Sequence, residues 1–157
     1  MLTWPQFAAL RPNLAEAGRA LLYQFDVGLG FLATTRADGG PRVHPMCPIM
    51  TEAGMYAFIV RGPKQRDLLR DGRYALHSFP CPDNEDAFSC MGSVREVGDD
   101  ELRRALSDVF VEERAALSVP APRDDEIAFE LLVDSCLLTR TTGHGDPNPV
   151  HQIWRAT

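Results

Sequence analysis

The sequence lacks the features that would place it in a membrane or send it out of the cell. No apolar run in its 157 residues approaches the roughly 20 residues that a membrane-spanning helix needs. The first residues contain neither the basic start nor the long apolar stretch of a secretory signal. We therefore expect a cytoplasmic protein without a membrane partner.

Paired cysteines are also missing. The four cysteines include no Cys-x-x-Cys pair, and a chain of this length with 45% apolar residues does not need disulfides. We interpret them as free thiols in a reducing compartment. Two sets of potential metal ligands occur, but neither has a usual zinc spacing, so we expect no bound metal. These sets are His77, Cys81 and Cys90, and His144, Asp146 and His151.

Positive charge is scarce and local. Residues 1–80 carry 9 basic and 6 acidic side chains, whereas residues 81–157 carry 7 basic and 16 acidic ones. A chain with a net charge of −6 does not attract nucleic acid non-specifically, so we expect no nucleic-acid partner. Lys64 is the only lysine, and it stands among arginines in the segment 61–66. Such a cluster suits a small anion better than a polyanion.

The spacing of apolar and turn residues predicts a mainly β domain with added helices (α+β). The pattern indicates N-terminal helices within residues 4–25, the second of them from about Asn13 to Phe25. A barrel of about residues 28–155 follows, with inserted helices over 63–70 and 99–117. We treat residues 1–157 as a single domain. The expected strands cover residues 30–35, 42–50, 55–60, 73–79, 88–97, 127–133 and 136–142, before an extended segment over 150–155.

The second of these strands, over residues 42–50, carries the most informative pattern. Arg42, His44 and Met46 should point to one face of it. Its two prolines cannot donate to a ladder, so the strand must be irregular or lie at a sheet edge. An arginine and a histidine on one face of such a strand indicate a lined pocket, although a purely structural histidine is the alternative.

A second candidate site is the turn that leads into the helix over residues 63–70. The free backbone N–H groups and the dipole at a helix start favour an anion, and Lys64 adds a full charge there. A solvated, charged helix surface is the alternative interpretation. The chain contains no Gly-x-Gly-x-x-Gly fingerprint, Walker loop or Gly-x-Ser-x-Gly elbow. Phosphate recognition here would therefore not be of the Rossmann or kinase kind.

The order and spacing of these segments resemble the pyridoxamine 5′-phosphate oxidase-like family, the flavin-binding split barrels. The resemblance covers about Leu21 to Val97. It rests most on Phe31–Gly39, Pro41–Pro45, Gly62–Leu76 and Phe88–Val97. It implies a split β-barrel of the FMN-binding type. It also implies a homodimer, with flavin mononucleotide (FMN) in a cleft at the subunit interface.

The resemblance also implies site residues. In that family the strand that matches residues 42–47 lies along the flavin ring, and the lysine that matches Lys64 binds the phosphate. A hydroxyl that often precedes this lysine is replaced by Gly-Pro here, and neighbouring arginines could compensate. A C-terminal aromatic residue often covers the partner's flavin, and an ordinary core anchor is the alternative for it. The implied cofactor site comprises Arg42, Val43, His44, Pro45, Met46, Arg61, Lys64, Arg66 and Trp154.

The implied activity is an FMN-dependent oxidoreductase that acts on a small molecule. His44 is the candidate catalytic residue for proton exchange near the ring, because an unperturbed imidazole titrates near neutrality. Residues 150–157 lack the Arg-x-His substrate motif of the true oxidase, so we do not expect oxidation of pyridoxamine phosphate itself. Two alternatives remain: a deazaflavin-dependent reductase in the same cleft, or a non-catalytic flavin or haem binder.

Overall fold

The computed structural model describes residues 1–156, which contain one antiparallel sheet of eight strands. Its order is β2-β1-β5-β6-β7-β4-β3, and β8 pairs with β7. The strands are β1 (Gly30–Thr35), β2 (Pro41–Met46), β3 (Ile49–Met50), β4 (Met55–Ile59), β5 (Arg73–Ser78), β6 (Ala87–Glu96), β7 (Ile127–Arg140) and β8 (Val150–Arg155).

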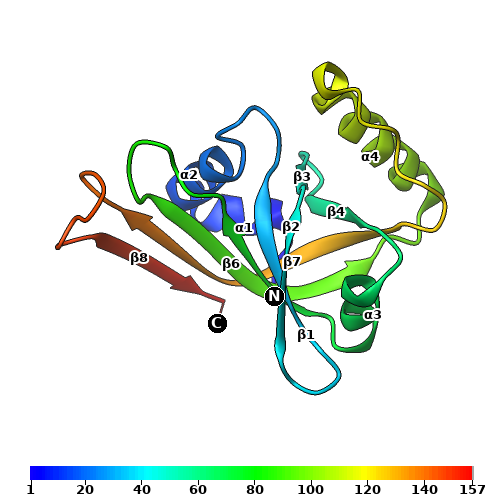
Figure 1. Cartoon of the computed structure of the whole chain (residues 1–157), viewed down its shortest axis with the longest axis horizontal. Coiled ribbons are helices and arrows are strands. Elements are labelled where there is room, and N and C mark those ends of the chain that lie inside the picture. Colours follow the sequence, from blue (N-terminus) through cyan, green and yellow to red (C-terminus); the bar gives the residue numbers. More distant parts are fainter. Residues whose placement is uncertain (157) are drawn as a thin grey trace.

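The two ends of the sheet belong to neighbouring pieces of chain. β2 lies at one end of the strand order and β3 at the other, yet only Cys47 and Pro48 separate them in sequence. The sheet must therefore curl until its ends approach each other, which gives the half-barrel seen in Figure 1. The structure confirms the predicted α+β split barrel.

The predicted strand over residues 42–50 is two strands, β2 and β3. The chain breaks at Pro48, which has no N–H to donate to a ladder. After the break, the backbone N–H of Met50 donates to the hydroxyl of Tyr23 at 2.9 Å. A side chain therefore accepts the hydrogen bond that a neighbouring strand would otherwise accept. The sequence predicts that this stretch is irregular or lies at a sheet edge, and the structure shows both the break at Pro48 and the two strands at the ends of the strand order.

The two strands predicted over residues 127–133 and 136–142 are one continuous strand, β7. Polar Asp134 and Ser135 suggest a turn, but the structure accommodates them in a β-bulge opposite Met91 and Gly92. A Cβ at Gly92 would lie only 1.9 Å from the carbonyl oxygen of Leu132. Glycine is therefore required where the two backbones approach this closely.

The helices are α1 (Trp4–Leu10), α2 (Pro12–Leu22), α3 (Pro63–Arg70) and α4 (Asp100–Glu113). α2 ends three residues before the predicted Phe25, whose side chain is 42% exposed. The N–H of Leu29 donates to the carbonyl of Leu22 at 2.9 Å. This bond closes a turn that sends the chain into β1, so the apolar periodicity that reaches Phe25 does not continue as helix.

The helices leave one face of the sheet open. α1 and α2 pack on the inner face, where Phe7, Leu22 and Phe88 are fully buried. α4 covers β3 and β4 through Leu106, which packs with Ile49 and Tyr56. No helix in residues 1–156 is long and apolar enough to cross a membrane.

Candidate functional site

The inner face of β2 carries the side chains that the sequence predicts to lie together. Arg42 pairs with Thr34 of β1 and Met46 pairs with Gly30, while His44 lies between them in the same register. Paired residues of antiparallel strands point to the same face, so these three side chains share the inner face as predicted. α3 lies beside this strand and carries the remaining predicted cations, except Arg61.

Lys64, the second residue of α3, lines the first cavity, which measures about 380 Å³. We call it the Lys64 cavity. Its walls are mostly apolar and aromatic, and they come from the β2–β3 break, β4, α4 and the loop after α4. The lining residues are Pro45, Met46, Cys47, Phe58, Val60, Lys64, Phe110, Val119, Pro120, Ala121, Pro122, Arg123 and Glu126.

Lys64 is half-buried and forms no ion pair within residues 1–156. Burial lowers the pKa of its ammonium group, and the electrostatic influence of Cys47 and Glu126 offsets this only in part. A partly desolvated cation that forms no ion pair is unfavourable on its own. An anionic ligand in the cavity would supply the missing charge.

A second cavity of about 550 Å³ lies on the other side of α3, against the β1–β2 hairpin. We call it the arginine cavity, because four arginines line it and only two acidic residues do. It shares no lining residue with the Lys64 cavity. Its residues are Arg36, Ala37, Asp38, Arg42, Pro63, Arg66, Asp67 and Arg70.

Asp67 organises the arginine cavity. Its carboxylate is 4% exposed and accepts hydrogen bonds from Arg42 Nε at 2.7 Å, Thr34 Oγ1 at 3.0 Å and Arg70 at 3.2 Å. Burial alone would raise the pKa of Asp67, but these hydrogen bonds outweigh it and hold the pKa below its ordinary value. Arg70 also donates to the carbonyl of Thr35, which ties α3 to the hairpin.

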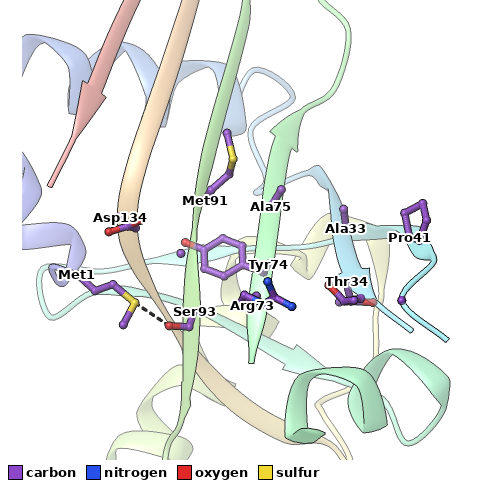
Figure 2. Close-up of a pocket in the computed structure, with 13 residues that line it drawn as sticks. Met1, Ala33, Thr34, Pro41, Arg73, Tyr74, Ala75, Met91, Ser93 and Asp134 are labelled. Carbon is purple, nitrogen blue, oxygen red and sulfur yellow. Dashed lines mark hydrogen bonds between the residues drawn. The ribbon is translucent and has the colours of Figure 1, made fainter. Parts of the chain in front are cut away.

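A third depression, the outer groove, lies on the open face of the sheet and measures about 670 Å³ (Figure 2). Ala33, Ala75 and Met91 follow one another across β1, β5 and β6, and Val43 of β2 extends the row beyond Ala33. Val43 is 59% exposed and Met91 is 44% exposed. The groove is therefore a largely apolar surface.

The structure does not gather all the predicted site residues. Pro45, Met46 and Lys64 line the Lys64 cavity, whereas Arg42 and Arg66 line the arginine cavity. The remaining predicted residues line none of the three cavities. His44 is exposed between Arg42 and Met46, Val43 points to the open face, and Arg61 is exposed before α3.

Trp154 lies apart from these residues. Its side chain is only 9% exposed, and its ring centroid is 4.8 Å from that of Phe7 in the core. This position corresponds to the core-anchor alternative rather than to an aromatic residue that reaches out of its own subunit.

Sequence reasoning misses several residues of both cavities. Phe110 lies far in sequence from the segments that the sequence singles out, and only the fold brings it to the Lys64 cavity. Arg36 lies within the segment Phe31–Gly39, but no local pattern marks it as a residue of the arginine cavity. The helical spacing of Arg66 and Arg70 does predict that they line the same cavity. They are four residues apart on a helix and so share a face, whereas Lys64 and Arg66 are two apart and point roughly 200° apart.

No protein-family model matches the sequence, and no curated protein matches it. Solved structures do resemble the fold. A haem-binding protein from Mycobacterium smegmatis is 18% identical with a TM-score of 0.66, and the match covers 90% of this chain and 58% of that one. An F420 reductase is 21% identical with a TM-score of 0.54, covering 69% of this chain and 87% of the other.

A protein from Listeria innocua that is assigned as a pyridoxamine 5′-phosphate oxidase is 12% identical with a TM-score of 0.59. That match covers 76% of this chain and 93% of that one. At these levels of identity the likeness concerns the fold. The chain described here has the same split-barrel fold, although it spans little more than half the length of the M. smegmatis protein.

Proposed function

We propose that the protein binds FMN in the Lys64 cavity and acts as an FMN-dependent oxidoreductase on a small molecule. The observation that carries this proposal is Lys64 itself, a half-buried cation without an ion-pair partner among residues 1–156. A phosphate monoester is the kind of anion that such a site favours. The split-barrel fold, which includes proteins that act with flavin-like cofactors, supports the same assignment.

The cavity fits the chemistry of a flavin. Phe58, Phe110 and Val60 offer apolar and aromatic surface to a planar ring, while Lys64 offers one positive charge to the phosphate. The cavity volume of about 380 Å³ lies within the range of small-molecule sites, roughly 300–1,000 Å³. The residues present therefore suit a ligand with an apolar ring and a single anionic end.

When bound, FMN would supply the hydride-transfer chemistry, and the protein would supply orientation and electrostatics. Lys64 would hold the phosphate, and Pro45 and Met46 would limit the position of the ring. α4 and the loop over residues 119–123 would exclude water from the opposite side. His44 is the exposed imidazole on the same face of β2, and we assign proton exchange with the substrate to it.

We also propose that the chain functions as a homodimer that pairs through the open face of the sheet. The row of Val43, Ala33, Ala75 and Met91 crosses four strands, and within residues 1–156 no helix covers it. An exposed apolar face of this kind marks an interaction surface. A twofold dimer would bury the same row on both subunits. A light-scattering mass of one chain at micromolar concentration would refute this proposal.

The cofactor is tested by equilibrium titration with FMN and with riboflavin. We expect FMN to bind more tightly, because only FMN has the phosphate that Lys64 would hold. Lys64→Gln should weaken FMN binding by roughly 1.5–3 kcal/mol and leave riboflavin unchanged. Arg155→Gln removes an exposed charge on β8, outside the Lys64 cavity, and is the matched control. Equal affinities for FMN and riboflavin would show that Lys64 does not bind the FMN phosphate.

The absorption spectrum of the purified protein discriminates among the cofactors. A flavin spectrum with FMN identified by mass supports the proposal, whereas a Soret band would assign haem and a deazaflavin mass would assign the reductase alternative. Each of these results identifies a different occupant for the same fold. Activity assays then follow with the cofactor that is found.

A further inference from the structure

We propose that the arginine cavity is a second anion site, separate from the Lys64 cavity, that takes the phosphate group of a small phosphate ester. It contains four arginines from the β1–β2 hairpin, β2 and α3, against two carboxylates. The inference goes beyond flavin binding and does not depend on it. A ligand or substrate with a phosphate group could occupy it whichever cofactor the protein uses.

The two cavities are separate because α3 lies between them. Arg66 and Arg70 share the face of α3 that meets the hairpin, as residues four apart on a helix do. Lys64 lies on the other face and meets the β2–β3 break instead. In Figure 1 the hairpin that follows β1 descends beside α3, which is the place where the arginine cavity lies.

Two of the four arginines are held in place before any ligand arrives. The buried carboxylate of Asp67 fixes Arg42 at 2.7 Å and Arg70 at 3.2 Å, and it also accepts from Thr34. One carboxylate between two guanidinium groups leaves one positive charge unbalanced. A site that is already ordered loses less conformational entropy when it binds.

Of the other two arginines, only Arg66 adds net positive charge to the cavity. Arg36 is balanced by Asp38 at 2.7 Å, but Arg66 forms no ion pair within the part of the chain that the structure describes. Taken together, the lining therefore carries two positive charges in excess. A phosphate monoester is a near-dianion at neutral pH. Its three terminal oxygens can accept from more than one guanidinium group at once, whereas a carboxylate has only two oxygens.

The test is a calorimetric titration of the full-length, cofactor-free protein with inorganic phosphate at low ionic strength and pH 7.5. We expect saturable binding in the wild type and in Lys64→Gln. Arg66→Gln should weaken it at least about tenfold, as expected when one charge-assisted hydrogen bond is lost. Arg140→Gln is the charge-matched control, because Arg140 is partly exposed, pairs with Asp86 and lines none of the three cavities.

Parallel titrations with FMN separate this inference from the flavin proposal. Arg66→Gln should leave FMN affinity unchanged, and Lys64→Gln should reduce it. If Arg66→Gln weakens FMN as much as phosphate, the cavity is the flavin-phosphate site and the inference is wrong. Loss of phosphate binding in Lys64→Gln but not in Arg66→Gln would also overturn it. So would absence of phosphate binding to the wild type, or tighter binding of succinate than of phosphate.

Discussion

Arg42 and Asp67 form the ion pair that joins β2 to α3, with Arg42 Nε 2.7 Å from Asp67 Oδ2. The carboxylate is buried, while the Arg42 side chain keeps 27% of its surface exposed toward the arginine cavity. Because Arg70 uses the other oxygen of the same carboxylate, one acidic residue orients two cations. The pair thus fixes the helix that separates the two cavities.

Asp67→Asn should destabilise the protein at pH 7 by about 1–2 kcal/mol. The amide keeps hydrogen-bonding capacity but loses the charge, and solvent screens the partly exposed arginines. The pKa of Asp67 lies below its ordinary value of 3.8, so its contribution is present above that pH. It is lost as the pH falls through the folded-state pKa. Urea unfolding from pH 7 to pH 3 should therefore show the difference from wild type shrinking in acid.

Asp108→Asn is the control for that experiment, because Asp108 is exposed on α4. Its unfolding free energy should stay within about 0.5 kcal/mol of wild type. A wild-type-minus-Asp67→Asn difference that is constant down to pH 3 would show that the charge of Asp67 does not stabilise the fold.

The sequence predicts local structure well where turn chemistry is decisive. β1 has the predicted bounds, and α3 begins at Pro63, because glycine, proline and turn residues mark both segments. Partnerships that depend on distant chain segments are not predicted. Arg42 and Asp67 are 25 residues apart, and nothing in either segment indicates that they meet.

The candidate site was predictable only in part for the same reason. The face of β2 follows from the two-residue period of a strand, so Arg42, His44 and Met46 are correctly grouped. The division of the cations between two cavities follows from the helical geometry of α3, in which Lys64 and Arg66 are two residues apart and point in different directions. The position of Phe110 in the cavity lining depends on how α4 packs, and no local sequence pattern predicts that packing.

Trp154→Ala tests whether Trp154 is a core anchor. Loss of a buried tryptophan costs about 3–5 kcal/mol, so the melting temperature of the cofactor-free protein should fall sharply. FMN affinity, measured below that temperature, should not change. Ile153→Ala is the neighbouring control, because Ile153 is 67% exposed and should have little effect on melting. An unchanged melting temperature with weakened FMN binding would instead support a contact with the partner's flavin.

Gly92→Ala tests the close approach of β6 and β7. The added Cβ would meet the carbonyl oxygen of Leu132 at 1.9 Å, and relieving that clash requires a backbone shift that costs about 1–3 kcal/mol. Gly98→Ala is a matched control, because no heavy atom lies within 4 Å of its added Cβ. Thermal unfolding should separate the two variants clearly. Similar melting temperatures would mean that the strands do not approach as closely as described.

Lys64→Met tests whether Lys64 strengthens ligand binding while it lowers the stability of the cofactor-free protein. Burial lowers the pKa of Lys64, so the folded state disfavours the charged form relative to the unfolded chain. Between the folded-state pKa and the ordinary value of 10.5, the unfolded chain binds more protons, so stability rises with pH in that window. Methionine removes the charge and keeps much of the side chain's length.

We therefore expect Lys64→Met to melt at a higher temperature than wild type without cofactor, while it binds FMN roughly 10- to 150-fold more weakly. Differential scanning calorimetry and FMN titration measure the two effects on the same samples. A higher melting temperature together with weaker FMN binding indicates a residue that binds the ligand but destabilises the cofactor-free protein. A variant that melts lower and binds FMN normally would show that Lys64 is structural, and the Lys64 cavity would lose the residue on which the flavin proposal depends.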